Sequence, residues 1–211
     1  MIGPVVHGPA NPSRVMLIGQ APGPREGELG RPFAWTAGRT LFRWFETATG
    51  VDEASFRAGV YISAVARCFP GKASGGGDRR PDREEIGRCQ RFLAREVQIL
   101  RPQLIVPVGG LAIEQVLGHK GPLVDVIGVQ RRVRYHEVDT EVICLPHPSG
   151  VSTWHRVEPG ITLLRRALEL VAHHPTFVST FRSTAIGNTP VAPSGACAGA
   201  ASPATRCSRT R

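Results

Sequence analysis

The residues of this chain that are best suited to chemistry stand in loops. His147-Pro148-Ser149 follows an apolar run, and a proline disfavours the helical region for the residue before it, so His147 is expected to be extended at a strand end. A rigid imidazole in such a place can donate a hydrogen bond to a developing anion. It can equally do no more than satisfy a nearby carbonyl oxygen. A Ser-His-Asp triad is a poor alternative, because the chain contains no nucleophile elbow Gly-x-Ser-x-Gly.

A second loop with chemical potential follows the apolar run Val15-Met-Leu-Ile18. Its first residues, Gly19-Gln-Ala-Pro-Gly23, combine glycines that allow a phosphate or a base to approach the backbone with a proline that stiffens the loop. A tight turn after a strand explains the same residues. The segment is neither the dinucleotide fingerprint nor a P-loop, so a nucleoside triphosphate site is unsupported.

The elements that must position these loops alternate between strands and helices. The pattern predicts strands at 15–18, 61–65 and 104–108, a final strand pair at 133–135 and 141–145, and helices from Ala37 to Gly50, from Asp82 to Pro102, at 111–117 and at 162–171. Asp82 with Glu85 three residues later forms a capping box. Between the second strand and this helix, a Gly-rich basic loop runs from Phe69 to Pro81.

This alternation predicts an α/β domain with a largely parallel sheet. In such sheets ligands bind beyond the carboxyl ends of the strands. The loop after Ile18, the loop after Val65 and His147-Pro148-Ser149 all lie there in this arrangement. We therefore expect the three segments to form one site.

The charge of the chain favours an anionic partner. With 26 Lys and Arg against 17 Asp and Glu among 211 residues, the net charge is +9. Four arginines and no acid lie in residues 178–211, which leaves +5 for residues 1–177. A basic body is typical of proteins that bind nucleic acid, although basic composition is common enough that charge alone does not decide.

Composition also sets the domain organisation and the compartment. We expect one domain over residues 1–177 and a disordered, low-complexity tail over 178–211, rich in Ser, Thr, Ala, Pro and Gly. No apolar run reaches the roughly 18 residues of a membrane span, and the first residues do not resemble a secretory signal. Five cysteines without a close spacing do not form a disulfide framework. A monomeric cytoplasmic protein of a bacterial cytosol or nucleoid is expected.

Four segments together carry a family resemblance. Gly19-Gln-Ala-Pro-Gly-Pro-Arg-Glu-Gly-Glu-Leu-Gly-Arg-Pro-Phe33, Ala37-Gly38, Tyr61-Ile-Ser-Ala-Val-Ala-Arg-Cys68 and His147-Pro148-Ser149 occur in the order and spacing of the uracil-DNA glycosylase superfamily. The chain resembles its iron–sulfur branch, the fourth and fifth families, over roughly residues 3–172. The resemblance implies a three-layer sandwich with a central, mainly parallel four-stranded sheet.

The activity that the resemblance implies is DNA repair. Such an enzyme flips a deaminated base, most simply uracil, out of damaged DNA and hydrolyses its N-glycosidic bond, which leaves an abasic site. By motif position, His147 would stabilise the leaving base and Phe33 would stack on it. Gly19, Ala21, Ala64 and Ser149 would complete the base pocket, and Gln20 and Glu26 would be the remaining catalytic candidates. Nothing suggests a lysine nucleophile, so a monofunctional enzyme is expected.

Two residues depart from the pattern of the fourth family. Gln20 stands where that family has a carboxylate thought to orient water, and a neutral amide cannot be a general base. Ala64 stands where it has an asparagine that reads the uracil edge, so discrimination is expected to weaken. Ala64 and Cys68 look nearer to the fifth family, which tolerates other deaminated bases.

The cofactor that the resemblance implies is a [4Fe–4S] cluster, which as a rule needs four thiolates. Cys68 and Cys89 match two of the family's ligands, and the other two should lie upstream of Gly3. We therefore expect two ligands to be absent from this chain, which is then without a complete cluster site. Cys144 is interpreted as a small core residue.

The expected DNA contacts lie in two loops. Lys72, Arg79 and Arg80 form a flexible basic loop that can neutralise phosphates, or that can simply be solvated. After the His-Pro-Ser motif, Val151 or Trp154 could wedge into the base stack, with Arg156 beside them. A Trp154 packed on the last helix is an equal alternative. The main rival function is a nucleic-acid-binding relative that keeps the pocket but is catalytically weak or inactive.

Overall fold

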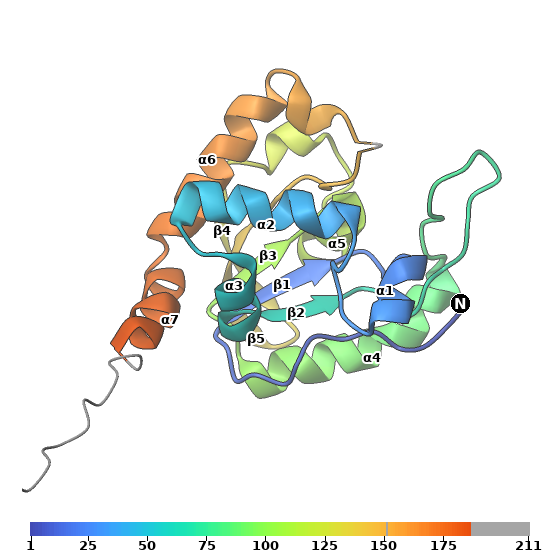
Figure 1. Cartoon of the computed structure of the whole chain (residues 1–211), viewed down its shortest axis with the longest axis horizontal. Helices are drawn as coiled ribbons and strands as arrows, with labels where there is room; N and C mark the ends of the chain where they lie inside the picture. Colours follow the sequence, from blue (N-terminus) through green and yellow to red (C-terminus); the bar gives the residue numbers. More distant parts are fainter. Residues whose placement is uncertain (151, 187–211) are drawn as a thin grey trace, which may run out of the picture.

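A five-stranded sheet lies at the centre of the fold. The structure is a computed structural model that describes residues 1–150 and 152–186 (Figure 1). The strand order is β2-β1-β3-β5-β4. The strands are β1 (Val15–Gly19), β2 (Tyr61–Ala64), β3 (Leu104–Pro107), β4 (Gln130–Tyr135) and β5 (Val138–Ile143).

The four-stranded sheet expected from the sequence corresponds to the parallel part of the observed five-stranded sheet. β2, β1, β3 and β5 run parallel, whereas β4 pairs antiparallel with β5 and adds a fifth, edge strand. His136 and Glu137 both adopt positive φ, which turns the chain back in a two-residue hairpin. The strand pair predicted from the sequence is therefore confirmed, and it joins the sheet as a hairpin at its edge.

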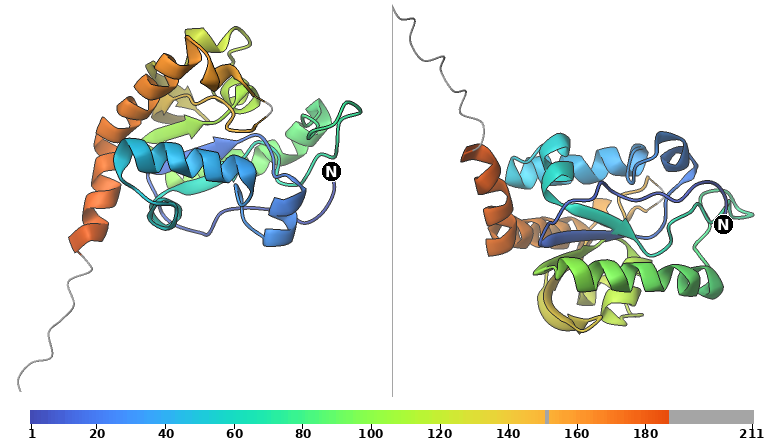
Figure 2. Two further views of the ribbon diagram at one scale, coloured as in Figure 1. Left: turned by 45° about the horizontal axis from the view of Figure 1, so that its top comes forward. Right: turned by 90° about the horizontal axis from the view of Figure 1, so that it is seen from below.

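Helices cover both faces of the sheet, which confirms the α/β three-layer architecture. α2 (Thr36–Thr49) and α3 (Glu53–Gly59) lie on one side, and α4 (Arg83–Leu100) lies on the other (Figure 2). α6 (Gly160–His173) packs against α2. The remaining elements are α1 (Pro24–Leu29), α5 (Gly110–Leu117) and the short 3-10 helices η1 (Leu123–Asp125) and η2 (Trp154–Arg156).

Local capping explains where two of these helices begin. The predicted capping box of α4 is present, with Glu85 N donating to Asp82 Oδ1 and Asp82 N donating to Glu85 Oε2, each at 2.9 Å. Sequence patterning missed α3, although Asp52 caps it by accepting a hydrogen bond from Ser55 N at 2.7 Å. It also missed α1, which begins with Pro24 inside the loop that was expected to be irregular.

The boundary expected at residue 177 is not respected by the structure. Helix α7 (Pro175–Ile186) crosses it, so residues 178–186 continue a helix instead of opening a disordered tail. The helix is held because Phe177 is buried against Phe45 and Phe56, aromatic residues of the core. The rest of the expected tail, residues 187–211, lies outside the described residues.

The carboxyl ends of the parallel strands meet at one edge, as predicted. At the end of β1, Gly19 O accepts from Val65 N at 3.0 Å and Ile18 O accepts from Val108 N at 2.8 Å, and after β5 Leu145 O accepts from Gly109 N at 2.9 Å. The loops after β1, β2 and β5 therefore open at the same edge. Among the described residues, no helix is long and apolar enough to cross a membrane.

Candidate active site

A cleft of about 740 Å³ opens at this edge of the sheet. It is lined by ten residues singled out from the sequence, namely Gly19, Gln20, Ala21, Glu26, Phe33, Ala64, Lys72, Arg79, His147 and Ser149. They come from segments up to 130 positions apart in the numbering. The structure thus brings together every residue that was proposed for catalysis and for base binding.

Other predicted residues do not line the cleft. Arg80 forms an ion pair with Glu114 of α5. Trp154 and Arg156 lie in η2, where the half-buried Trp154 packs against the core, which is the alternative left open by the sequence. Val151 lies outside the described residues. A role in DNA binding for Arg80, Trp154 and Arg156 remains a prediction.

His147 has a defined tautomer in this cleft. Its Nδ1 accepts a hydrogen bond from Ser149 N at 3.2 Å, so the proton of the neutral ring lies on Nε2. Burial lowers the pKa of His147 from 6.5; the Asp78 carboxylate opposes this shift and His155 adds to it. Among the described residues Nε2 has no hydrogen-bonding partner. His147 therefore lines the cleft as a neutral imidazole with a free N–H donor.

The backbone of Gly109 fixes the position of this ring. Gly109 precedes α5 with a φ of +86°, and a Cβ atom added there would lie 3.0 Å from His147 Cδ2. Both the conformation and the close approach favour glycine at this position. Gly109, which follows β3, therefore contacts the imidazole of His147, which follows β5.

Phe33 is held in a conformation that is unusual for its type. Its φ is +52°, in the left-handed region that non-glycine residues rarely adopt. Arg57 of α3 holds this backbone by donating to Pro32 O and to Phe33 O, each at 2.9 Å. Gly38 allows the approach on the other side, because a Cβ atom there would lie 1.7 Å from Phe33 O.

The Phe33 ring lies over the start of the first loop. A Cβ atom added to Gly19 would lie 2.9 Å from Phe33 Cζ, so glycine leaves room for the ring. Because Phe33 also lines the cleft, its ring can offer a face to a planar ligand. The arrangement is a flat aromatic wall in the same cleft as the imidazole donor.

Two carboxylates converge on the first loop. A Cβ atom added to Gly23 would lie 2.8 Å from Glu26 Oε2 and 3.2 Å from Asp78 Oδ2. Glu26 is buried in α1, whereas Asp78 belongs to the Gly-rich loop after β2 and is exposed. Sequence reasoning missed Asp78, and only the fold brings it beside Glu26.

The end of β2 offers the cleft little hydrogen-bonding capacity. The Ser63 hydroxyl donates to Glu96 Oε2 on α4 at 2.8 Å. The Tyr61 hydroxyl donates to the other oxygen of Glu96, and burial, followed by this contact, raises the pKa of Tyr61. Ala64, the next residue to line the cleft, contributes only a methyl group. Ser63 therefore does not replace the hydrogen bonds to the uracil edge that an asparagine at the position of Ala64 would make.

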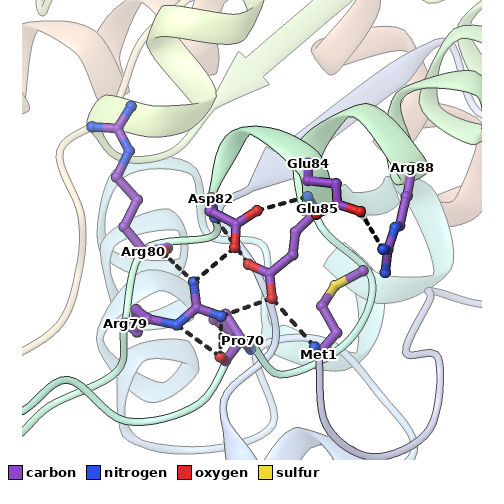
Figure 3. Close-up of polar contacts among 8 residues, drawn as sticks. All are labelled: Met1, Pro70, Arg79, Arg80, Asp82, Glu84, Glu85 and Arg88. Carbon is purple, nitrogen blue, oxygen red and sulfur yellow. Dashed lines mark hydrogen bonds and ion pairs between the residues drawn. The ribbon is translucent and has the colours of Figure 1, made fainter.

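The basic side chains of the loop after β2 are paired with acidic side chains rather than free. Lys72 Nζ lies 2.7 Å from Asp78 Oδ1. Arg79 donates to Pro70 O at 3.0 Å and to Glu85 Oε1 at 2.7 Å, and the amino group of Met1 reaches the same Glu85 oxygen at 3.3 Å (Figure 3). The Arg79 guanidinium is the main reason that the pKa of Glu85 falls to about 2. Arg79 therefore ties the loop to the beginning of α4.

The cysteines of the chain do not by themselves fit a complete metal site. Cys68 and Cys89 lie near enough for their charges to interact, and burial, followed by this interaction, raises the pKa of Cys68. Within the described residues, no group of three or more His, Cys, Asp or Glu side chains could hold a metal ion. Two thiols are half of the set that a [4Fe–4S] cluster needs. Cys144 is buried, as expected.

Comparison with known proteins identifies the family of the chain. The model of the uracil DNA glycosylase superfamily matches residues 5–178. A type-4 uracil-DNA glycosylase from Pyrobaculum aerophilum is 33% identical over 141 residues, which cover 65% of this chain and 67% of the relative. Another from Sulfurisphaera tokodaii is 28% identical over 142 residues, 65% of this chain and 60% of the relative.

The fifth family is represented as well. A type-5 uracil-DNA glycosylase from Pyrobaculum aerophilum is 30% identical over 176 residues, which cover 74% of this chain and 71% of the relative. The family model spans both the sheet and the three loops that form the cleft. The chain therefore belongs to the uracil DNA glycosylase superfamily, and it is similar to members named type 4 and type 5.

Proposed function

We propose that this protein is a monofunctional uracil-DNA glycosylase, which hydrolyses the N-glycosidic bond of a uracil flipped out of damaged DNA. The observation that carries the proposal is the pairing of His147 with Phe33 in one cleft, a fixed N–H donor and an aromatic wall. The cleft lies at the carboxyl ends of the strands, and family membership supports the same activity.

The proposed chemistry separates two charges. The bond between C1′ and N1 breaks with its electron pair on the base, so uracil leaves as an anion and the sugar becomes cation-like. Neutral His147 donates its Nε2–H to the developing negative charge, and Phe33 holds the plane of the base. A water molecule then bonds to C1′ and gives up a proton to a carboxylate, and the departed base anion takes up a proton, which completes hydrolysis.

Carboxylates are the natural partners for this water and for the cation-like sugar. The Gln20 amide can hold water by hydrogen bonds but cannot accept its proton. Glu26 and Asp78 meet beside Gly23 at the same cleft. We assign these roles, to accept the proton of the water and to balance the positive charge of the sugar, to this pair of carboxylates. Glu26 is buried, and Asp78 lies on the loop after β2.

Lys72 does not act as a nucleophile in this scheme. Its ammonium is paired with Asp78, and a protonated amine cannot attack C1′. We propose instead that Lys72, which lines the cleft, contacts a DNA phosphate. We therefore expect a monofunctional reaction, in which the base is released and the DNA strand stays intact.

The base range is proposed to be broader than uracil alone. Ala64 offers no hydrogen bond, and Ser63 is committed to Glu96, so the edge of the base is read weakly at β2. Other deaminated bases that stack on Phe33 and accept a bond from His147 are therefore possible substrates. The match to a type-5 relative agrees with this proposal.

An iron–sulfur cluster takes no part in these steps. Cys68 and Cys89 are proposed as two of its ligands, and the described residues do not complete the set. Iron and sulfide analysis of the purified protein, beside a Cys68→Ser variant, tests this point. Iron that disappears in the variant supports the assignment, and iron that persists contradicts it.

A labelled oligonucleotide with one central uracil tests the proposed function. It is presented single-stranded and opposite guanine, and alkali reveals abasic sites. Release of uracil with the strand intact before alkali treatment, lost in His147→Gln, is the expected result. Salt-dependent DNA binding without release of any deaminated base would overturn the proposal in favour of an inactive binding relative.

A further inference from the structure

An exposed tryptophan stands at the rim of the cleft. Trp35 is 47% exposed and immediately precedes α2, with an extended backbone. The other two tryptophans, Trp44 and Trp154, pack against the core, whereas among the described residues Trp35 is not part of that packing. An indole that lines a cleft but supports no core is suited to contact a ligand.

Two guanidinium groups lie over this indole. Arg25 of α1 and Arg39 of α2 place their Cζ atoms 5.5 Å and 5.7 Å from the ring centroid. Arg39 lies one helical turn after Trp35 and is exposed, and Arg43, one turn further along the same face, is exposed too. Arg25 is also paired with Glu28 on the surface at 2.8 Å. Positively charged side chains from α1 and α2 therefore lie next to the indole ring of Trp35.

This combination matches the chemistry of single-stranded DNA. Non-specific single-strand sites place aromatic rings where bases stack and line the path with basic side chains that meet the phosphates. Guanidinium groups beside the ring add cation–π attraction and neutralise charge at the same place. A base inside an intact duplex is already stacked on both faces, whereas an unpaired base is free to stack on an exposed indole.

We propose that Trp35, Arg25 and Arg39 form a stacking subsite for an unpaired base next to the flipped nucleotide, so that the protein favours single-stranded DNA. The inference rests on the proposed function, because the cleft places the target base. Trp35 holds the neighbouring base, and Arg39 and Arg43 lead the backbone along the exposed face of α2.

Phe92 provides a matched control for Trp35. It is 45% exposed on α4 and has two guanidinium neighbours, Arg67 at 5.2 Å and Arg91 at 4.8 Å. It does not line the cleft, and α4 covers the other face of the sheet (Figure 2). Removing Phe92 deletes a similar exposed aromatic side chain away from the proposed subsite.

The experiment measures binding without chemistry. Oligonucleotides carrying a uracil nucleotide analogue that resists hydrolysis are titrated, single-stranded and duplex, into the full chain and its variants. Trp35→Ala is expected to weaken single-strand binding about tenfold and duplex binding much less. Trp35→Phe is expected to restore most of the affinity, and Phe92→Ala to leave it unchanged. Arg39→Ala, at an exposed site, is a second variant, and it is expected to weaken single-strand binding as well.

Fluorescence gives a readout that is independent of affinity. Single-stranded DNA should quench the emission of Trp35, so the quench should be clearly smaller in Trp35→Phe, which keeps Trp44 and Trp154. Equal losses of affinity on single strand and duplex, or a quench of undiminished size in Trp35→Phe, would overturn the subsite. Base release by the wild type is assayed separately. Release of uracil together with unchanged single-strand binding by Trp35→Ala refutes the subsite alone, whereas failure of release with an intact quench refutes the proposed function alone.

Discussion

Arg57 is expected to control base binding from outside the cleft. Its side chain is 12% exposed, and its guanidinium donates to Pro32 O and Phe33 O at 2.9 Å each. Hydrogen bonds from charged donors contribute about 1.5–3 kcal/mol each, and Arg57 also lies over the Phe42 ring at 4.4 Å. Because water can reach part of the vacated site, we expect Arg57→Ala to lower the free energy of unfolding by about 2–4 kcal/mol.

The consequence for the site follows from the strained backbone of Phe33. A positive φ at a non-glycine residue costs about 1–3 kcal/mol and persists only while its surroundings hold it. Without Arg57 the loop can relax, and the Phe33 ring leaves its place over Gly19. Base stacking is worth about 1–3 kcal/mol, so binding of an extrahelical base should weaken by about tenfold.

The assay combines urea unfolding with titration of an uncleavable uracil analogue in DNA. Glu53→Gln is the matched control, because it removes the 2.8 Å ion pair with Arg57 but leaves both carbonyl contacts. It should cost less than about 1 kcal/mol and leave affinity unchanged. In a Phe33→Ala background, Arg57→Ala should cause no further loss of affinity. Additive losses of affinity would refute the view that Arg57 acts through Phe33.

Three further predictions concern the imidazole and the carboxylates. Gly109→Ala should reduce base release and lower the free energy of unfolding by about 1–3 kcal/mol, because Gly109 has a positive φ and the added methyl group meets the His147 ring. Urea unfolding and single-turnover release check this prediction. Unchanged release would contradict the view that Gly109 fixes the position of the ring. The pKa of His147 is lowered from 6.5, so its contribution to stability is present above pH 6.5 and is lost as the pH falls toward the folded pKa. The difference in unfolding free energy between wild type and His147→Gln should therefore shrink below pH 6.5, and a difference that grows in acid would contradict the assignment. Glu26→Gln and Asp78→Asn should each slow release at saturating DNA, together by more than either alone; wild-type rates in the double variant would exclude a carboxylate role.

Regular local patterns allowed much of the fold to be predicted. The buried runs that form β1, β2 and β3 and the capping box of α4 are confirmed close to their expected positions. Short elements were missed, since α1 has only six residues and α3 seven, too few for a helical period to stand out. An Asp-x-x-Ser signal at Asp52 could have revealed α3.

Only those residues of the site that lie in recognisable sequence motifs could be predicted. The alternation of strands and helices predicted that the loops carrying His147 and Phe33 lie at one edge of the sheet, and the resemblance to family segments suggested the roles of the two residues. Arg57 was missed because it acts on a backbone 24 residues away, and Asp78 because a Gly-rich loop has no period. Arg79 was expected to meet DNA phosphates, but its contacts with Pro70 and Glu85 become visible only in three dimensions.

The most direct test of the central claim compares two leaving groups. Single-turnover base release is measured from uracil and from 5-fluorouracil, whose anion is more stable, with wild type and His147→Gln. If neutral His147 stabilises the departing base, the variant should lose about 10²–10³-fold with uracil and distinctly less with 5-fluorouracil. Equal losses with both bases would contradict the claim, as would undiminished release of uracil by the variant.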